Sequence, residues 1–164
     1  MNGIVRKARM QDLLRIEEIY AYARDFMQRN GNPDQWGNHH PPQEQLVQDI
    51  GAGDLFVIEY GDIIHGVFFF RIGNDPTYDQ IFDGSWRSAM PYGTIHRIAG
   101  DGTGGILRTA VDYGASMIKH LRIDTHHDNY VMQRALQKQG FQKRGIIYIE
   151  DGTPRIAYDK LIEE

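Results

Sequence analysis

The sequence predicts a single α/β domain that spans residues 1–164. Strand-like and helix-like runs alternate along the chain, which is the pattern of α/β domains. The run Val67–Phe70 is apolar at every position, as expected for a central strand that helices cover on both faces. A glycine-dense stretch, 100–105, follows a strand-like run and precedes an amphipathic run. This order predicts a strand, a loop and a helix in succession.

The composition excludes several classes of function. The chain has 41% hydrophobic residues over 164 positions, which is enough to bury a core. Eighteen basic and 22 acidic residues give a net charge of −4, which argues against a nucleic-acid partner. Cysteine is absent, so disulfides, thiolate nucleophiles and cysteine-bound zinc are excluded. Because no segment has the apolar length of a signal or a membrane span, we expect a cytoplasmic protein with no membrane partner.

The first half of the chain predicts a strand, two helices and a hairpin. Residues 4–8 are strand-like, and apolar residues at helical spacing predict a helix over 11–29. A second helix, 43–50, starts after a Pro-Pro pair and ends at a Gly-Ala-Gly run. Two strand-like runs, 55–60 and 63–72, are joined by Gly-Asp, which predicts a tight hairpin.

The second half alternates between strands and helices. The glycine loop follows a strand that starts at Tyr92, and Asp128 or Asn129 is a natural N-cap for the last helix. The predicted elements after the loop are a helix over 105–119, a strand over 121–125, a helix closed by Gly140, and two strands over 141–150 and 154–161. Between the hairpin and Tyr92, residues 77–90 mix aromatic with acidic side chains. They either line a site for an amine or pack on the sheet as a lid.

The glycine loop suggests a pyrophosphate site. Glycines let the backbone approach a bulky anion, and the free N–H groups of the first helical turn point toward it. A Walker loop is excluded because no lysine follows Gly105, and a dinucleotide fingerprint is expected after a first strand, whereas roughly ninety residues precede this loop. The alternative is a glycine-rich connection without a ligand.

The chain resembles the GNAT superfamily, the Gcn5-related N-acetyltransferases. The glycine loop, the strand Arg122–Thr125, Asn129 and the pair Gly140-Phe141 carry the resemblance, which covers essentially the whole chain. It implies a mixed, twisted sheet of about seven strands flanked by about four helices. It also implies acetyl-CoA as the co-substrate.

The sequence departs from the family pattern in two places. At the loop the family has Gln/Arg-x-x-Gly-x-Gly/Ala. With Gly105 in the first glycine position, Gly102 stands at the Gln/Arg and Leu107 at the second glycine. Many members also carry a tyrosine four residues before Gly-Phe, where it protonates the departing thiolate, and here that residue is Leu136.

The resemblance implies a set of cofactor-binding residues. Backbone N–H groups around Ile98 and Ala99 would polarise the thioester carbonyl, and Asn129 would touch the pantetheine arm. The expected cofactor-binding residues are Ile98, Ala99, Gly100, Gly102, Thr103, Gly104, Gly105, Ile106 and Asn129.

Candidate catalytic residues follow from the chemistry of acetyl transfer. His96, on the strand before the loop, is the expected base, with a water relayed from Asp83 or Glu150 as the second choice. His126 and Tyr130 are the candidates for protonating the thiolate. For each histidine the alternative is a hydrogen-bonded residue without a catalytic part.

The acceptor site is expected to include Trp36 and Trp86, since variable loops form acceptor pockets in the family. No metal is expected. The side chains of the adjacent pair His39 and His40 diverge, and no acidic ligand lies at a helpful spacing.

The sequence therefore predicts transfer of an acetyl group from acetyl-CoA to a primary amine of a small molecule or peptide by direct attack. A non-catalytic acyl-CoA-binding or sensing module is the alternative, because of the two departures. A histidine-based metal hydrolase is a third hypothesis, which rests only on the two His-His pairs. A homodimer paired through the C-terminal strands is possible, as is common in the family.

Overall fold

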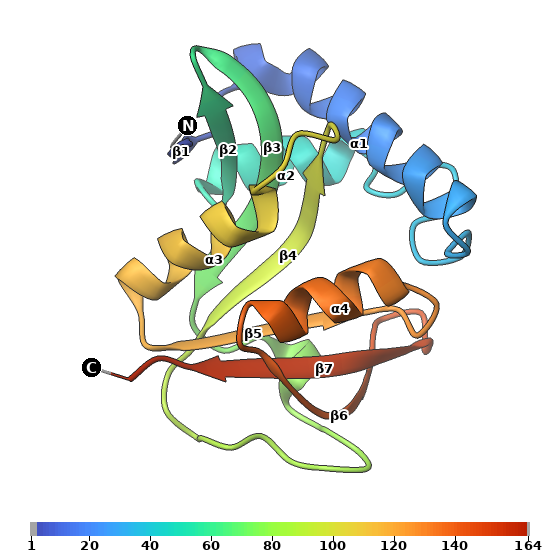
Figure 1. The fold of residues 1–164 in the computed structure, drawn as a ribbon, viewed down its shortest axis with the longest axis vertical. Helices are drawn as coiled ribbons and strands as arrows, with labels where there is room; N and C mark the ends of the chain where they lie inside the picture. The colour runs from blue at the N-terminus through green and yellow to red at the C-terminus, as the bar shows by residue number, and fades with distance from the viewer. Residues whose placement is uncertain (1–2, 164) are drawn as a thin grey trace.

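The structure is a computed structural model that describes residues 3–163. It confirms the predicted α/β fold: one mixed sheet of seven strands in the order β1-β2-β3-β4-β5-β7-β6, with four α-helices (Figure 1). The strands are β1 (Ile4–Lys7), β2 (Leu55–Tyr60), β3 (Ile63–Ile72), β4 (Gly93–Gly100), β5 (His120–Thr125), β6 (Gln142–Tyr148) and β7 (Pro154–Leu161). The helices are α1 (Leu13–Arg29), α2 (Gln43–Ala52), α3 (Ile106–Met117) and α4 (Tyr130–Lys138), and short 3₁₀ turns occupy Met10–Asp12 and Pro76–Tyr78.

The sheet opens between its two central strands. β4 and β5 are the parallel pair, and they pair only at Gly93 with Leu121 and at Thr94 with Arg122. Beyond Thr94 the two strands diverge, as Figure 1 shows for the yellow-green β4 and the orange β5. Alternate N–H and C=O groups of a strand point to opposite edges. Half of those on the later part of β4 therefore face the opening without a strand partner.

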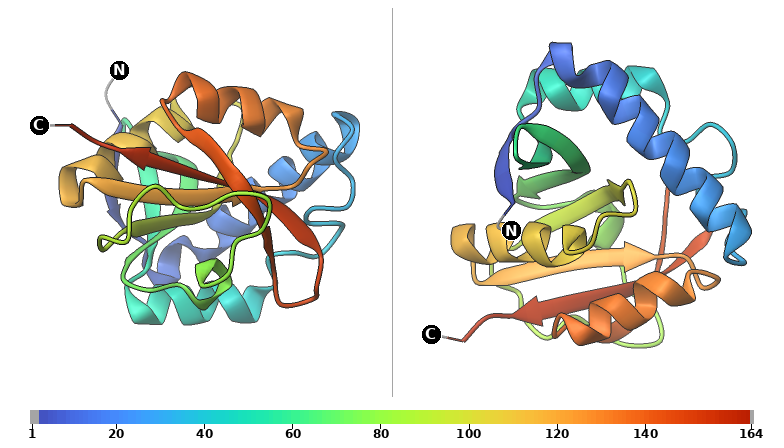
Figure 2. Two further views of the ribbon diagram at one scale, coloured as in Figure 1. Left: turned by 90° about the horizontal axis from the view of Figure 1, so that it is seen from below. Right: turned by 45° about the horizontal axis from the view of Figure 1, so that its top comes forward.

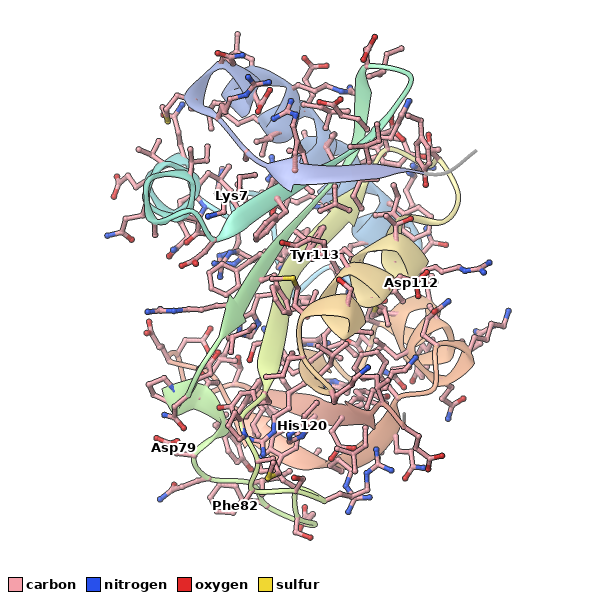
Figure 3. The ribbon with its side chains drawn as sticks, turned by 90° about the vertical axis from the view of Figure 1, so that its left-hand side faces the viewer. Lys7, Asp79, Phe82, Asp112, Tyr113 and His120 are labelled. Carbon is pink, nitrogen blue, oxygen red and sulfur yellow. The ribbon has the colours of Figure 1, made fainter. Side chains whose placement is uncertain are left out.

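Helices cover both faces of the first half of the sheet. α1 and α2 pack on one face through a core that includes Ile16, Leu46 and Val57, and α3 packs on the other face against Phe68 and Ile95. In Figure 3, Tyr113 lies between α3 and the strands, whereas Asp112 lies on the outer side of the helix. The apolar run Val67–Phe70 is thus buried from both sides, as its sequence predicted.

The second half of the sheet lies between α4 and the long connection from β3 to β4. α4 contributes Leu136 to the core on one face. On the other face, residues 73–92 cross the strands and bury Tyr78 against Ile147 and Ala157. Figure 2 shows this connection in green, and Figure 3 labels Asp79 and Phe82 on it. Of the two interpretations of residues 77–90, the structure supports packing on the sheet.

Two of the element boundaries that differ from the sequence prediction lie at glycines. Helix α2 runs to Ala52 rather than to residue 50, because Gly53 alone takes the left-handed conformation (φ 75°) and its N–H caps the carbonyls of Asp49 and Ile50. Strand β4 extends to Gly100, which pairs with Gly66 on β3. Cβ atoms at these two glycines would lie 2.9 and 2.8 Å from Ile106, so both allow α3 to pack closely on the sheet.

No helix within residues 3–163 combines the length and the apolar character needed to cross a membrane.

Candidate active site

A cleft of about 610 Å³ lies where β4 and β5 diverge. Both strands, the loop between α1 and α2, the start of α4 and the turn between β6 and β7 form its walls. The lining residues used below are Trp36, His96, Arg97, Ile98, Asp124, Asn129, Glu150, Asp151 and Arg155.

A β-bulge shapes the β4 wall of this cleft. Phe69 pairs with His96 and Val67 pairs with Ala99, so that Arg97 and Ile98 together face the single residue Phe68. Arg97 has a φ of 49°, a conformation that is rare for a residue with a side chain. Bulges redirect side chains and interrupt pairing, and they concentrate near active sites.

The surrounding helices hold the bulge in place. The Tyr20 hydroxyl of α1 donates to the Arg97 carbonyl at 2.6 Å, and the Arg97 guanidinium donates to Asp49 of α2 at 2.7 Å. The same guanidinium lies 4.6 Å from the centre of the Phe69 ring. Because a trans peptide places C=O and N–H on opposite sides, the bond from Tyr20 turns the Ile98 N–H away from α1.

His96 lies between two carboxylates. Its Nε2 is 2.7 Å from Asp75 Oδ2, and its Nδ1 is 3.7 Å from Asp124 Oδ2. Asp124 also accepts a hydrogen bond from the buried Tyr78 hydroxyl at 2.7 Å. A loop, a 3₁₀ turn and two strands thus converge on one imidazole, with an acid on each ring nitrogen.

Electrostatics favour an ionised Asp75 and a neutral Tyr78. Burial acts to raise the pKa of Asp75, but the hydrogen bond and charge of His96 and the bonds from Thr77 outweigh it and lower the pKa to about 2. Burial, followed by the charge of Asp124, raises the pKa of Tyr78 well above its usual value. Tyr78 therefore remains a hydrogen-bond donor to Asp124 over the physiological pH range.

The glycine loop has the backbone geometry expected of an anion cradle. Gly102 and Gly105 have φ values of 95° and 85°, which side chains rarely adopt. A Cβ at Gly102 would lie 2.6 Å from the Tyr22 hydroxyl. Gly105 precedes α3 without a side-chain cap, so the first N–H groups of α3 lack intrahelical partners and are available to an anion.

An acidic residue within the loop is held by basic partners. Asp101 accepts from Arg15 at 2.8 Å and is 2.7 Å from His65 Nδ1. It also accepts from the Thr103 N–H at 3.1 Å, which shapes the loop. Burial acts to raise the pKa of Asp101, but the bonds from Thr103 and His65 lower it overall. The charge of Asp101 is thus offset by the Arg15 guanidinium at the site expected to bind phosphate.

Asn129 is the N-cap of α4 and also lines the cleft. Its side-chain oxygen accepts from the Met132 N–H at 3.0 Å, and its Nδ2 donates to Gln35 at 3.0 Å. Trp36 lies on the same α1–α2 loop as Gln35 and packs edge-on against Tyr20, with 5.6 Å between the ring centres. The structure therefore brings the predicted residues Asn129, Trp36, His96 and Ile98 together in one cleft.

Three of the predicted catalytic and acceptor-site residues lie outside the cleft lining. Tyr130 is 59% exposed at the start of α4. His126 is buried, its Nδ1 accepts from the Asp128 N–H at 3.0 Å, and burial followed by the charge of Arg155 lowers its pKa. Contrary to its predicted role in the acceptor site, Trp86 packs on Tyr78, its Nε1 donates to the Tyr78 carbonyl, and Arg122 stacks on its ring at 4.0 Å. These contacts hold Trp86 against the sheet, outside the cleft lining.

The second His-His pair forms a compact group. His126, His127 and Asp128 bring three possible ligand atoms within 4.8 Å of one another. However, these residues are consecutive, and His126 Nδ1 already accepts a backbone hydrogen bond. The expectation that the protein needs no metal stays a prediction.

Sequence reasoning missed the partners of His96. Asp75 and Tyr78 lie in a segment without periodicity, and Asp124 appeared only as a residue of the fifth strand. One local feature did indicate a structural role for Asp75. It precedes Pro76, and an aspartate at this position is a common N-cap, which here accepts from the Thr77 N–H. Contact with His96 arises from folding and has no pattern in the sequence.

Comparison with solved structures supports a superfamily assignment. No protein-family model matches the chain, and no curated protein matches it. Among solved structures, a GNAT-family acetyltransferase from Streptococcus agalactiae is 26% identical, with a TM-score of 0.89 over 99% of this chain and 96% of that chain. A GNAT-family acetyltransferase from Listeria monocytogenes is 17% identical, with a TM-score of 0.72 over 98% of this chain and 95% of that chain.

A third structure is similar in fold. It is yncA from Salmonella typhimurium, a candidate acetyltransferase with its cofactor acetyl-CoA, which is 14% identical with a TM-score of 0.62 over 100% of this chain and 96% of that chain. The chain belongs to the GNAT superfamily. The similarity to acetyltransferases supports acyl transfer in general as its activity.

Proposed function

We propose that the protein is an N-acetyltransferase that transfers the acetyl group of acetyl-CoA to a primary amine of a small molecule or peptide. The observation that carries the proposal is the position of His96, which lies in the cleft between β4 and β5 with a carboxylate on each ring nitrogen. Acetyl-CoA supplies an activated acetyl thioester. The resemblance to yncA, which carries acetyl-CoA, supports this choice of co-substrate.

Residues of this chain suit that co-substrate. The open edge of β4 offers N–H and C=O groups to the amides of a pantetheine arm, as a neighbouring strand would. The loop from Gly100 to Gly105 and the first turn of α3 offer N–H groups to a pyrophosphate. The Ile98 N–H, turned away from α1, is the donor that we assign to the thioester carbonyl oxygen.

His96 is the base. An amine with a lysine-like pKa is protonated at pH 7, and freeing its lone pair costs about 4.6 kcal/mol. His96 Nδ1 takes that proton, directly or through one water, while Asp75 accepts from Nε2–H and orients the ring, and Asp75 and Asp124 stabilise its charge. The amine nitrogen then bonds to the acetyl carbon, the carbon–sulfur bond breaks, and the nitrogen releases its remaining excess proton to solvent as the amide forms. Because Leu136 has no acidic hydrogen, the departing thiolate takes its proton from solvent and not from that position.

Isothermal titration with acetyl-CoA tests the first half of the proposal. Gly105→Glu places a carboxylate and bulk in the cradle, and we expect it to abolish the micromolar binding of the wild type. Gly31→Glu is the matched control, because Gly31 has a similar φ of 80° and open space around its Cβ. No binding to the folded wild type would refute the proposal.

Release of the CoA thiol in the presence of an amine panel tests the second half. His96→Gln is expected to lower kcat about 10²- to 10⁴-fold, the usual contribution of a general base. The second candidate function is an acyl-CoA-binding or sensing module, favoured by Leu136 and Gly102 at positions where the family has a tyrosine and Gln or Arg. Binding without turnover of any amine would support that module.

A further inference from the structure

Arg155 lies on the face of the sheet opposite α4 and lines the cleft. It is on β7 next to Ile156, which packs into the core beneath α4 together with Leu136. Adjacent strand residues point to opposite faces. Arg155 therefore shares the other face with Ala157, and Ala157 is paired with Asp124 of β5. The Arg155 side chain lines the cleft from this face, away from α3 and α4.

The Arg155 guanidinium is buried and only partly bonded. The residue is 6% exposed, and its Nη1 donates to Thr153 Oγ1 at 3.1 Å and to the Pro154 carbonyl at 2.9 Å. Within residues 3–163, no carboxylate oxygen lies within 4.0 Å of it, and its Nε and Nη2 have no hydrogen-bond acceptor. Neither atom is sealed from solvent. Two donors of one guanidinium thus remain available to the cleft.

The other arginine that lines the cleft is already paired, because Arg97 donates to Asp49. A buried cation without a counter-ion is costly unless a ligand supplies one. Burial lowers the pKa of Arg155, and the charges of Asp124 and Asp151 act in the opposite direction. Arg155 is therefore suited to receive an anion from the cleft.

The remaining charges of the cleft define the kind of anion. Its lining includes four carboxylates, Asp34, Asp124, Glu150 and Asp151, which favour an ammonium group and disfavour a dianion. A guanidinium edge with two donors matches the two oxygens of a carboxylate. A monovalent carboxylate next to an amine satisfies both conditions.

We propose that the acceptor is a small amine that also carries a carboxylate, such as an α-amino acid, and that Arg155 binds the carboxylate while the amine is presented to His96. This inference rests on the proposed function and names the substrate class of the same site. Arg155 is a specificity-determining residue in this assignment, whereas His96 performs the proton transfer.

The test measures kcat/KM for thiol release with L-amino acids, each paired with its own α-amide. The amide removes the negative charge with little change in shape and leaves an α-amino group that is easily deprotonated. We expect the wild type to favour each accepted amino acid over its amide by about 10- to 100-fold, as for a charge-assisted bidentate pair. A phosphate-bearing amine, glucosamine 6-phosphate, is included as a further acceptor.

Variants locate the preference at one residue. Arg155→Gln is expected to raise KM for the amino acid until the preference is lost, with kcat/KM for the amide unchanged. Arg155→Lys keeps the positive charge but not the two parallel N–H donors of the guanidinium, and is expected to lose part of the preference for the amino acid over its amide. The matched control is Arg122→Gln, which removes a buried arginine on the same sheet face outside the cleft lining and should keep the preference.

Several outcomes would overturn the inference. They are equal use of acid and amide by the wild type, a preference for the phosphate-bearing amine, or a loss in Arg155→Gln that is the same for acid and amide. Each of these leaves the acetyltransferase activity in place and refutes the acceptor assignment alone. Acetyl-CoA binding without turnover of any amine would refute the proposed function and this inference together. The wild-type comparison decides the matter even if Arg155→Gln does not fold.

Discussion

The contact between Asp75 and His96 can be tested through stability. The Asp75 Oδ2 lies 2.7 Å from His96 Nε2, and the Asp75 Oδ1 accepts from the Thr77 N–H at 3.0 Å. The Asp75 side chain is 19% exposed. The pKa of Asp75 is lowered from 3.8 to about 2. By linkage, this shift corresponds to about 2 kcal/mol of folding free energy.

The sign of the pH dependence follows from the direction of the shift. A carboxyl group with a lowered pKa stabilises the folded state above its unfolded pKa, and this contribution is lost as the pH falls through its folded pKa. Asp75→Asn removes the charge at all pH values. We therefore expect the variant to be about 2 kcal/mol less stable than the wild type at pH 7, and the difference to narrow as the pH falls from about 4 toward 2.

Urea denaturation of the wild type and Asp75→Asn between pH 7 and pH 2.5 measures this difference. Asp79→Asn is the matched control, because Asp79 is an exposed acid on the same connection (Figure 3) and should change stability little at any pH. If Asp75→Asn has wild-type stability at pH 7, or if its deficit does not change with pH, the contact between Asp75 and His96 does not stabilise the fold and the role of Asp75 in orienting His96 must be abandoned.

Three further predictions concern the surroundings of the site. Tyr78→Phe removes the hydrogen bond to Asp124, which should lower the free energy of unfolding in urea by about 1–3 kcal/mol. Because the pKa of Tyr78 is raised, the phenolate absorbance of Tyr78 should appear in the wild type only when the protein unfolds at alkaline pH. Asp49→Asn leaves the Arg97 guanidinium partly buried without its partner and should cost about 3–5 kcal/mol, whereas a loss below 1 kcal/mol would mean that this pair does not hold the bulge. Leu136→Tyr introduces the family's tyrosine into a fully buried position and should lower stability by about 1–3 kcal/mol without raising the rate of thiol release, while a faster release would show that the side chain reaches the cleft.

Much of the fold was predictable because its signals are local. The hairpin between β2 and β3 falls at the predicted residues, since the Gly-Asp turn and the flanking apolar runs lie within one short stretch. Asn129 is the N-cap of α4 for the same reason: it needs only the Met132 N–H three residues later. Two of the boundary errors, at Gly53 and Gly100, occurred where several glycines stood together and only some of them have a positive φ.

The candidate site was predictable only in part. The GNAT resemblance indicated His96, Ile98, Asn129 and Trp36, and all four line the cleft. Trp86 was assigned to the acceptor site because variable loops form acceptor pockets in the family, and folding placed it against Tyr78 and Arg122, outside the cleft lining. The catalytic roles of His96, His126 and Tyr130 stay predictions.

The sequence by itself determined the order of strands and helices, the turns and caps between them and the superfamily, because propensity, periodicity and capping depend on residues close together in the chain. Only the tertiary structure decided that Asp75, Asp124 and Tyr78 meet at His96 and that Arg155 lines the same cleft. These contacts require the divergence of β4 from β5, the bulge at Arg97 and the packing of residues 73–92 on the sheet. Each of these features joins segments that are distant in sequence, so local sequence patterns do not indicate the contacts.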